Sequence, residues 1–276
     1  MVDWKIGVMA PLCAEGPSLH VVEEFGLDAC QLVNWDMSLW DEERAVNVRR
    51  EAESKGIVIS ALWAGVPGPD VWDFIQGPDV LGLVPPKYRA ERVASLKDAG
   101  RFAKALGVRA AITHLGFIPE NPTDPAFDDL VNAVREVAEY YKTLDLEFWF
   151  ETGQETPVAM LRTIEVVGTG NLGLNLDPAN LILYGKANPV DALEMFGKYV
   201  RNVHAKDGFY PTDPMKLGEE VPVGEGAVDF PELVRRLDAL GYDGEFIIER
   251  EIEGAEQKRD IARTVDYLKK LFEEVA

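Results

Sequence analysis

The sequence predicts a single (β/α)8 barrel, that is, a TIM barrel, and three observations lead to this prediction. Short apolar runs alternate with longer amphipathic segments from one end of the chain to the other, which is typical of βα units around a parallel sheet. Eight such pairs fit into 276 residues, and this length suits one barrel. No linker or low-complexity segment interrupts the chain, so we expect one domain over residues 1–276.

Each predicted strand is an apolar run, and a predicted helix follows it. The strands are Lys5–Met9, Ala29–Val33, Ile57–Leu62, Arg109–Thr113, Glu147–Glu151, Leu172–Leu176, Asn202–His204 and Glu245–Glu249. The helices are Pro17–Phe25, Glu42–Lys55, Ala90–Leu106, Ala126–Leu144, Pro157–Val167, Pro189–Val200, Pro231–Leu240 and Ala255–Phe272. Gly56 and Gly107 follow two of these helices, where glycine commonly ends a helix. Pro157, Pro189 and Pro231 each begin a predicted helix, and the first helical turn accepts proline.

An open, doubly wound sheet is the alternative architecture. Such a sheet usually carries a glycine-rich phosphate turn after its first strand. The residues here are Met9-Ala10-Pro11-Leu12-Cys13, which do not form such a turn. The closed barrel is therefore favoured.

Composition excludes several classes of function. The formal net charge of −20 repels nucleic-acid phosphates and anionic membranes, but it is compatible with a neutral substrate and a divalent cation. No apolar run approaches the roughly 18 to 20 residues that span a bilayer, and the N-terminus lacks the layout of a signal peptide. The two cysteines, Cys13 and Cys30, do not make a disulfide framework. We expect a cytoplasmic protein with no nucleic-acid and no membrane partner.

Two long segments follow predicted strands. Trp63–Lys87 is rich in glycine, proline and aromatic residues, and Asp207–Asp229 follows the seventh strand. Loops of this length are often functional, and both lie at the face where barrel active sites are found. Trp72, Phe74 and Phe209 suit a cover that excludes water from a site. Ordered surface loops or contacts between subunits are equally compatible with these segments.

The end of each of the last four strands carries a residue type that binds metals. Glu151 ends Phe148-Trp149-Phe150-Glu151, Asp177 follows Asn175-Leu176, His204 ends Asn202-Val203-His204, and Glu249 ends Phe246-Ile247-Ile248-Glu249. Neighbouring strands of a barrel converge at its mouth, so these side chains are expected to meet. Three carboxylates and an imidazole suit one divalent ion, Mn²⁺ first and Mg²⁺ or Co²⁺ next. Unrelated polar strand ends are the alternative.

Further side chains near these strand ends are candidates for binding the substrate. His114 ends the fourth strand, Glu155 follows Glu151, and Lys206 follows His204. Lys206 could neutralise an oxyanion and Asp207 could support a metal ligand. A core role for His114 and a solvated position for Glu155 stay open. The complete set of substrate-binding candidates is His114, Glu155, Asn180, Lys206 and Trp63.

Three motifs resemble a known family. They are Asp177-Pro178-Ala179-Asn180, His204-Ala205-Lys206-Asp207-Gly208, and Pro222-Val223-Gly224-Glu225-Gly226-Ala227-Val228-Asp229-Phe230. Together with the four strand ends they resemble the sugar phosphate isomerase/epimerase superfamily, the xylose isomerase-like TIM barrels. The resemblance covers essentially the whole chain and is strongest over residues 150–250.

Within this superfamily the D-tagatose 3-epimerase and D-psicose 3-epimerase branch is the nearest model. The resemblance implies that Glu151 and Glu249 are both metal ligands and the catalytic acid/base pair, and that Asp177 and His204 are ligands only. It further implies a free ketose as substrate, epimerised through an enediolate, and a homo-oligomer, either a dimer or a tetramer.

The sequence departs from that branch where the substrate is bound. Asn180 stands where the branch has a histidine, and Glu155 is closer to Glu151 than the second glutamate of the branch. Phe209 and Tyr210 occupy the region of an arginine. These departures leave the particular sugar open.

Other functions remain to be weighed. A metal-dependent elimination, as in inosose dehydratases or deglycosidases of 3-keto glycosides, uses the same enediolate. A sugar-binding or scaffold protein with a vestigial site would be expected to lack a ligand, whereas all four are present. Endonuclease IV shares the fold but binds three zinc ions with many histidines, and this chain has only three histidines.

Overall fold

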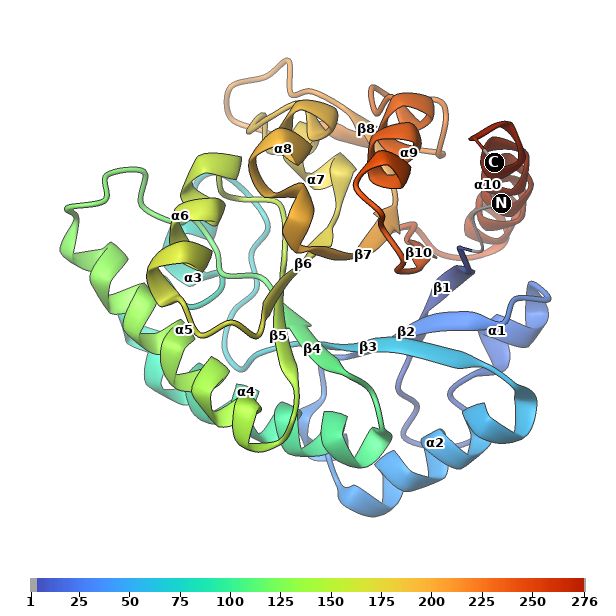
Figure 1. The fold of residues 1–276 in the computed structure, drawn as a ribbon, viewed down its shortest axis with the longest axis horizontal. Helices are drawn as coiled ribbons and strands as arrows, with labels where there is room; N and C mark the ends of the chain where they lie inside the picture. Colours follow the sequence, from blue (N-terminus) through green and yellow to red (C-terminus); the bar gives the residue numbers. More distant parts are fainter. Residues whose placement is uncertain (1–3, 276) are drawn as a thin grey trace.

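Eight parallel strands close into a barrel in the computed structural model, which describes residues 4–275 (Figure 1). Each strand pairs with its neighbours in the chain, and the last pairs with the first. The barrel strands are β1 (Ile6–Pro11), β2 (Ala29–Asn34), β3 (Val58–Ala64), β4 (Ala110–Thr113), β5 (Glu147–Glu151), β6 (Leu172–Leu176), β7 (Val200–Ala205) and β10 (Phe246–Ile248). The predicted TIM barrel is confirmed.

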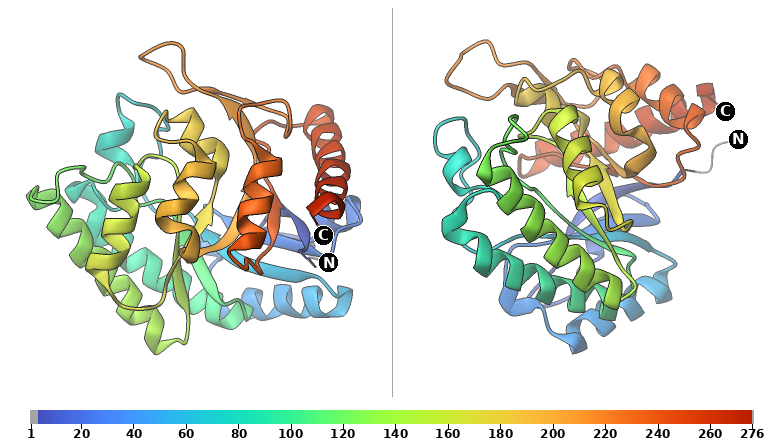
Figure 2. Two further views of the ribbon diagram at one scale, coloured as in Figure 1. Left: turned by 45° about the horizontal axis from the view of Figure 1, so that its top comes forward. Right: turned by 60° about the vertical axis from the view of Figure 1, so that its left-hand side comes forward.

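The helices pack around the outside of this barrel (Figure 2). They are α1 (His20–Glu24), α2 (Glu42–Lys55), α3 (Gly77–Val80), α4 (Pro86–Leu106), α5 (Pro125–Thr143), α6 (Pro157–Val167), α7 (Pro178–Leu183), α8 (Pro189–Phe196), α9 (Phe230–Ala239) and α10 (Ala255–Val275). Two short 3-10 helices, η1 (Met37–Leu39) and η2 (Gly197–Tyr199), complete the set.

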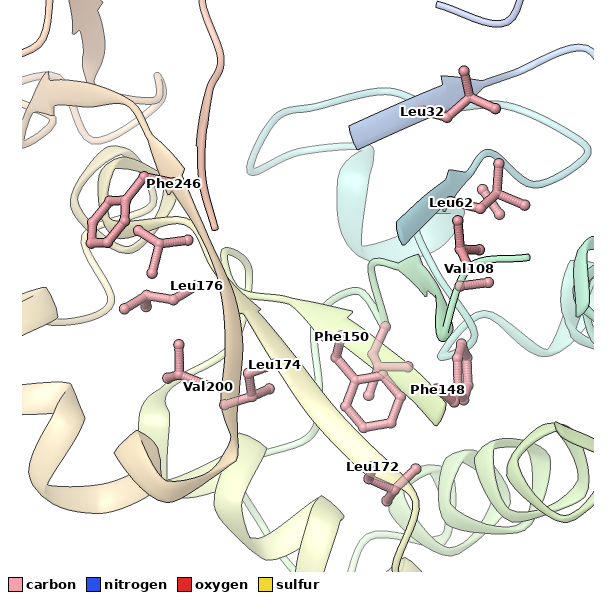
Figure 3. Close-up of a cluster of buried hydrophobic side chains, with 14 of the residues drawn as sticks. Leu32, Leu62, Val108, Phe148, Phe150, Leu172, Leu174, Leu176, Val200 and Phe246 are labelled. Carbon is pink, nitrogen blue, oxygen red and sulfur yellow. The ribbon is translucent and has the colours of Figure 1, made fainter. Parts of the chain in front are cut away.

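Strand β5 shows how the sequence directs side chains into the barrel. Successive residues of a strand point to opposite faces. Phe148 and Phe150 belong to the large core between strands and helices (Figure 3). Trp149 belongs instead to a small cluster with Ala61, Trp63, Ala110 and Ile112, inside the barrel. Glu151 shares the inward register of Trp149 and therefore reaches the barrel axis at the end of the strand.

Several predicted element boundaries are wrong; for example, α4 begins at Pro86 rather than at Ala90. The helix predicted over Pro189–Val200 ends at Phe196, and after η2 the strand β7 begins at Val200. Sequence periodicity does not separate a short helix from an apolar strand that follows it directly. Trp63 does not open a loop; it lies within β3 and its side chain is buried.

Both long segments contain secondary structure. The first includes α3, and the second includes an antiparallel pair, β8 (Asp207–Phe209) with β9 (Glu219–Val221). Helix α7, which directly follows Asp177, was not predicted. Residues 63–87 are fixed by the buried guanidinium of Arg92, which donates to the carbonyls of Pro67, Pro69, Val80 and Gly82. Whether either segment acts as a lid stays a prediction.

Asp207 organises the loop that carries the third sequence motif. Its carboxylate accepts hydrogen bonds from the backbone N–H groups of Gly208, Gly224, Gly226 and Val228, each about 3 Å long. A Cβ at Gly226 would lie 2.1 Å from Asp207 Oδ1, so only glycine fits there. Asp207 thus shapes the loop rather than supporting a metal ligand.

Among residues 4–275, no helix is both long and apolar enough to cross a bilayer. Cys13 and Cys30 are both free thiols. The single domain over residues 1–276 and the cytoplasmic location stay predictions.

Candidate metal centre

The four predicted ligands meet at the mouth of the barrel. One ligand atom from each of Glu151, Asp177, His204 and Glu249 lies within 4.8 Å of every other. Glu151 ends β5, Asp177 directly follows β6, His204 lies in β7, and Glu249 directly follows β10. Such spacing suits one divalent ion, whose oxygen ligands lie about 2.0 to 2.6 Å away from it.

The hydrogen bonding of these side chains fits a metal ion. The buried side-chain atoms without a hydrogen-bond partner within residues 4–275 include Asp177 Oδ2, His204 Nδ1 and Glu249 Oε2. Buried polar atoms are rarely left unpaired in folded proteins. All three face the shared centre, where His204 Nδ1 lies 2.9 Å from Glu249 Oε2 and 3.8 Å from Asp177 Oδ2. A cation at this centre would satisfy all three.

His204 is oriented by polar side chains inside the barrel. Its Nε2 lies 2.9 Å from Gln31 Oε1, and a proton on Nε2 leaves Nδ1 free to bind a metal. Asn202 Nδ2 donates to Asn175 Oδ1 over 2.6 Å, next to the ring. Burial lowers the pKa of His204, but Glu151 and Glu249 more than offset burial and raise it well above its ordinary value.

Glu151 is held by three donors. Trp63 Nε1 and Asn175 Nδ2 donate to Oε2, the latter over 3.2 Å, and Asn180 Nδ2 donates to Oε1 over 3.3 Å. His114 Nε2 lies 3.4 Å from Oε1. Burial raises the pKa of Glu151, but the charges of His204 and His114 lower it by more. The pKa therefore lies well below its ordinary value. The carboxylate is therefore fixed and ionised.

Asp177 also starts a helix. Its side chain accepts from the backbone N–H of Asn180 over 2.8 Å, which caps the N-terminus of α7. The other oxygen, Oδ2, is the one that faces the centre. One carboxylate thus fixes α7, and with it Asn180, relative to the candidate ligands.

Lys206 lies beside the centre and is 1% exposed. Its Nζ is 2.6 Å from Glu251 Oε1 and 3.5 Å from both Asp177 Oδ2 and Glu249 Oε2. Burial lowers the pKa of Lys206, but Glu249, Glu251 and Asp177 outweigh burial and raise it well above its ordinary value. With a divalent ion, the ammonium would balance the three carboxylates of the centre.

A cavity of about 350 Å³ opens above these residues. Three tryptophans form one wall: the ring centroids of Trp35 and Trp63 are 4.8 Å apart, and those of Trp35 and Trp72 are 6.3 Å apart. Glu151 and Glu249 reach this cavity. An aromatic wall opposite carboxylates and a cation suits a sugar, which has an apolar C–H face and polar hydroxyl groups.

The other predicted substrate-binding residues fall into two groups. Trp63, His114 and Asn180 line the cavity. Glu155 and Lys206 are buried beside it and are not among its lining residues. Phe74 packs on Tyr184, with ring centroids 5.9 Å apart. The substrate contacts themselves stay predictions.

Several residues of the site were not identified from the sequence. Gln31, Asn175 and Asn202 support the ligands, and Trp35 and Glu251 line the cavity. A usable signal exists for the first three, because each is a polar residue within an apolar strand. Such a residue must find a partner in the interior, and here the partners are candidate metal ligands or the side chains that hold them.

The comparisons with known proteins agree with this fold. The chain belongs to the xylose isomerase-like TIM barrel family, whose model matches residues 19–271. The crystal structure of a xylose isomerase domain protein from Planctomyces limnophilus has 33% sequence identity and a TM-score of 0.93, over 99% of this chain and 98% of that one.

Two further similar proteins are named after enzymes. A D-tagatose 3-epimerase-like protein has 22% identity and a TM-score of 0.75, over 98% of both chains. An inosose dehydratase of Geobacillus thermodenitrificans is 28% identical over 131 residues, which are 42% of this chain and 41% of that protein. The predicted resemblance to the xylose isomerase-like TIM barrels is confirmed, and the epimerase branch stays a prediction.

Proposed function

We propose that this protein is a divalent-metal-dependent sugar isomerase or epimerase that transfers a proton next to the carbonyl of a free ketose. The carrying observation is the convergence of Glu151, Asp177, His204 and Glu249, whose candidate ligand atoms lie within 4.8 Å of one another. Mn²⁺ is our first choice of ion, because carboxylates and one imidazole suit it.

The two glutamates suit proton transfer at opposite faces of one carbon. A bound divalent ion would act as a Lewis acid and make the hydrogen on the carbon next to the carbonyl more acidic. Glu151 ends β5 and Glu249 directly follows β10, and these strands are separated around the barrel by β6 and β7. They therefore approach the cavity from different sides. One removes the proton and the other delivers one to the opposite face, which inverts the carbon; delivery to the former carbonyl carbon would instead interconvert aldose and ketose.

The surroundings of the cavity favour a substrate without a phosphate group. Arg92 donates to four loop carbonyls, and Arg89 donates to the carbonyls of Leu83 and Val84 and pairs with Asp129. Lys206 is paired with Glu251. These cations are engaged within the protein, so a free sugar fits better than a sugar phosphate.

A second candidate is elimination of a β-leaving group from the same kind of carbanion. The match to an inosose dehydratase supports it. Both reactions start with removal of a proton next to a carbonyl, and they differ in whether a leaving group departs before a proton returns.

Incubation with ketoses and inososes in D₂O with Mn²⁺ tests both. We expect deuterium at one carbon beside the carbonyl, detected by NMR, and either an epimer or a dehydrated product. Addition of EDTA should abolish the exchange. Exchange that persists after complete removal of metal would contradict the proposal.

A further inference from the structure

A second cavity lies next to the cavity above the candidate metal centre. It encloses about 480 Å³ between α1 and the start of α10. Four residues line both cavities: Met9, Val33, Glu249 and Glu251. Because Glu249 is a candidate ligand and a candidate proton carrier, the wall that the two cavities share includes a residue of the proposed reaction.

The lining of this second cavity combines apolar and polar side chains. Val8, Val21, Phe25, Ile248 and Ile261 supply the apolar part. His20, Glu253 and Gln257 supply groups that can exchange hydrogen bonds with a ligand. Ligand sites commonly combine an apolar surface with a few polar groups that fix orientation. A pyranose ring matches this lining, because its C–H face is apolar and its edge carries hydroxyls.

The charges of this cavity disfavour an anionic ligand. Lys258 is paired with Glu24. Arg250 is paired with Asp260 over 2.9 Å and with Glu220 over 3.1 Å. Both fixed cations that line the cavity are thus neutralised by carboxylates, and Glu251 and Glu253 add further negative charge. A phosphate or carboxylate group would be repelled here, whereas a neutral ring would not.

We propose that the second cavity binds a neutral sugar ring attached to the reacting sugar, so that the substrate has two rings. The reacting ring would lie against Trp63 and the metal centre, and its partner between α1 and α10. Glu251 lies at the junction and is fixed by Lys206 through its side chain and by Glu220 through its backbone N–H. This inference rests on the proposed function, since the position of the reacting carbon comes from it.

Substrate pairs of one and two rings test the inference. Fructose is compared with turanose, leucrose and isomaltulose, in which glucose is attached to fructose at O3, O5 or O6. We expect a kcat/KM for deuterium exchange about tenfold higher for at least one disaccharide, the equivalent of about 1.4 kcal/mol of added binding. If fructose reacts as well as all three, the inference is overturned.

Filling the second cavity provides the matched variants. Val21→Trp places a large ring in it, and Val166→Trp makes the same change on an exposed face of α6. Val21→Trp should lower the disaccharide kcat/KM about tenfold, with less than a twofold change for fructose; Val166→Trp should change neither. If Val21→Trp does not fold, Gln257→Trp fills the same cavity from α10. Equal losses for fructose and disaccharide in the filled variant would contradict the inference.

Binding separates failure of this inference from failure of the proposed function. Saturation-transfer NMR is recorded with the Mg²⁺-loaded protein and each disaccharide. Transfer to both rings, with the glucose signal lost in Val21→Trp, supports the second subsite even if no sugar exchanges deuterium; in that case only the proposed reaction fails. Transfer to the fructose ring alone, or to neither ring, overturns the inference.

Discussion

Glu151 and Glu249 have the same proposed chemistry but different surroundings. The Glu151 side chain is 3% exposed and accepts from Trp63, Asn175 and Asn180. The Glu249 side chain is 18% exposed, and its Oε2 has no hydrogen-bond partner among residues 4–275. One carboxylate is fixed and sealed from solvent, whereas the other is less constrained and reaches solvent. The difference suggests that Glu249 exchanges its proton with water and Glu151 does not.

The two carboxylates are kept ionised by different cations. Burial raises the pKa of both, and both values nevertheless fall below the ordinary one. For Glu151 the opposing charges are those of His204 and His114. For Glu249 they are those of Lys206 and then His204. Burial alone does not determine ionisation here; the neighbouring cation does.

Replacing each glutamate by glutamine has the largest expected effect. Glu151→Gln and Glu249→Gln should each lower epimerisation on the order of 10³-fold, because an acid/base group contributes about 10²- to 10⁴-fold. The residual reactions should differ. Glu151→Gln retains the solvent-exposed base and should still wash substrate hydrogen into D₂O, whereas Glu249→Gln should show little washout. NMR of the recovered substrate measures this, and equal washout would contradict the assigned difference.

Glu155 extends the comparison to a buried carboxylate without a close cation. Burial raises its pKa from 4.5 to about 7, and its Oε2 has no hydrogen-bond partner among the described residues. The folded protein therefore favours the protonated form. Protonated Glu155 therefore adds to the free energy of unfolding in full below about pH 4.5, and this addition is lost as the pH rises through about 7. At pH 8 the loss amounts to ~3 kcal/mol.

Glu155→Gln should remove this loss. In metal-free protein, the free energy of unfolding of the variant minus that of the wild type should be ~3 kcal/mol larger at pH 8 than at pH 4.5. Urea denaturation at both pH values measures the gain. Glu165→Gln, at an exposed position of α6, is the control and should show no gain. A Glu155→Gln variant that follows the wild type across this range would mean that Glu155 is ionised when buried.

Asp177→Asn separates the two roles of Asp177. Asparagine also caps helices well, so α7 should persist, while the ligand charge is lost. Mn²⁺ at about 100 times its Kd should stabilise the wild type by ~2.7 kcal/mol, measured as a rise in Tm, and the variant should lose most of this rise. Asp41→Asn makes the same change at the N-cap of α2, and this variant should keep the full rise in Tm with Mn²⁺. A full Mn²⁺ shift in Asp177→Asn would exclude Asp177 as a ligand.

The fold and the positions of the candidate ligands were predictable because each depends on a local pattern. The alternation of apolar runs and amphipathic helices fixes the barrel, and the exact bounds of β5 and β6 followed from it. The four ligands were identifiable because each ends or directly follows an apolar run. Their convergence then required only that neighbouring strands end at one face.

The rest of the site depends on contacts that span the chain. Gln31 lies 173 residues before His204, and Trp63 lies 88 residues before Glu151. No local pattern specifies which polar residue of one strand meets a ligand of another. Helix α7 was missed because six residues are too few to show helical periodicity. The position of Lys206 next to Glu251 likewise depends on the closure of β10 against β7.

Trp63→Phe tests the support of Glu151 with the smallest expected effect. The change removes the indole N–H that donates to Oε2 and keeps an aromatic side chain in the cavity wall. A hydrogen bond to a charged group contributes about 1.5 to 3 kcal/mol, but Asn175 and Asn180 remain as donors, so we expect about a tenfold loss in kcat/KM. The Mn²⁺-dependent rise in Tm should persist, because the four ligands remain.

Trp40→Phe removes an indole N–H that has no partner among residues 4–275 and should leave activity unchanged. Equal activities of the two variants would show that Asn175 and Asn180 suffice to fix Glu151. Glu151 and Glu249 would then differ in solvent exposure more than in hydrogen bonding.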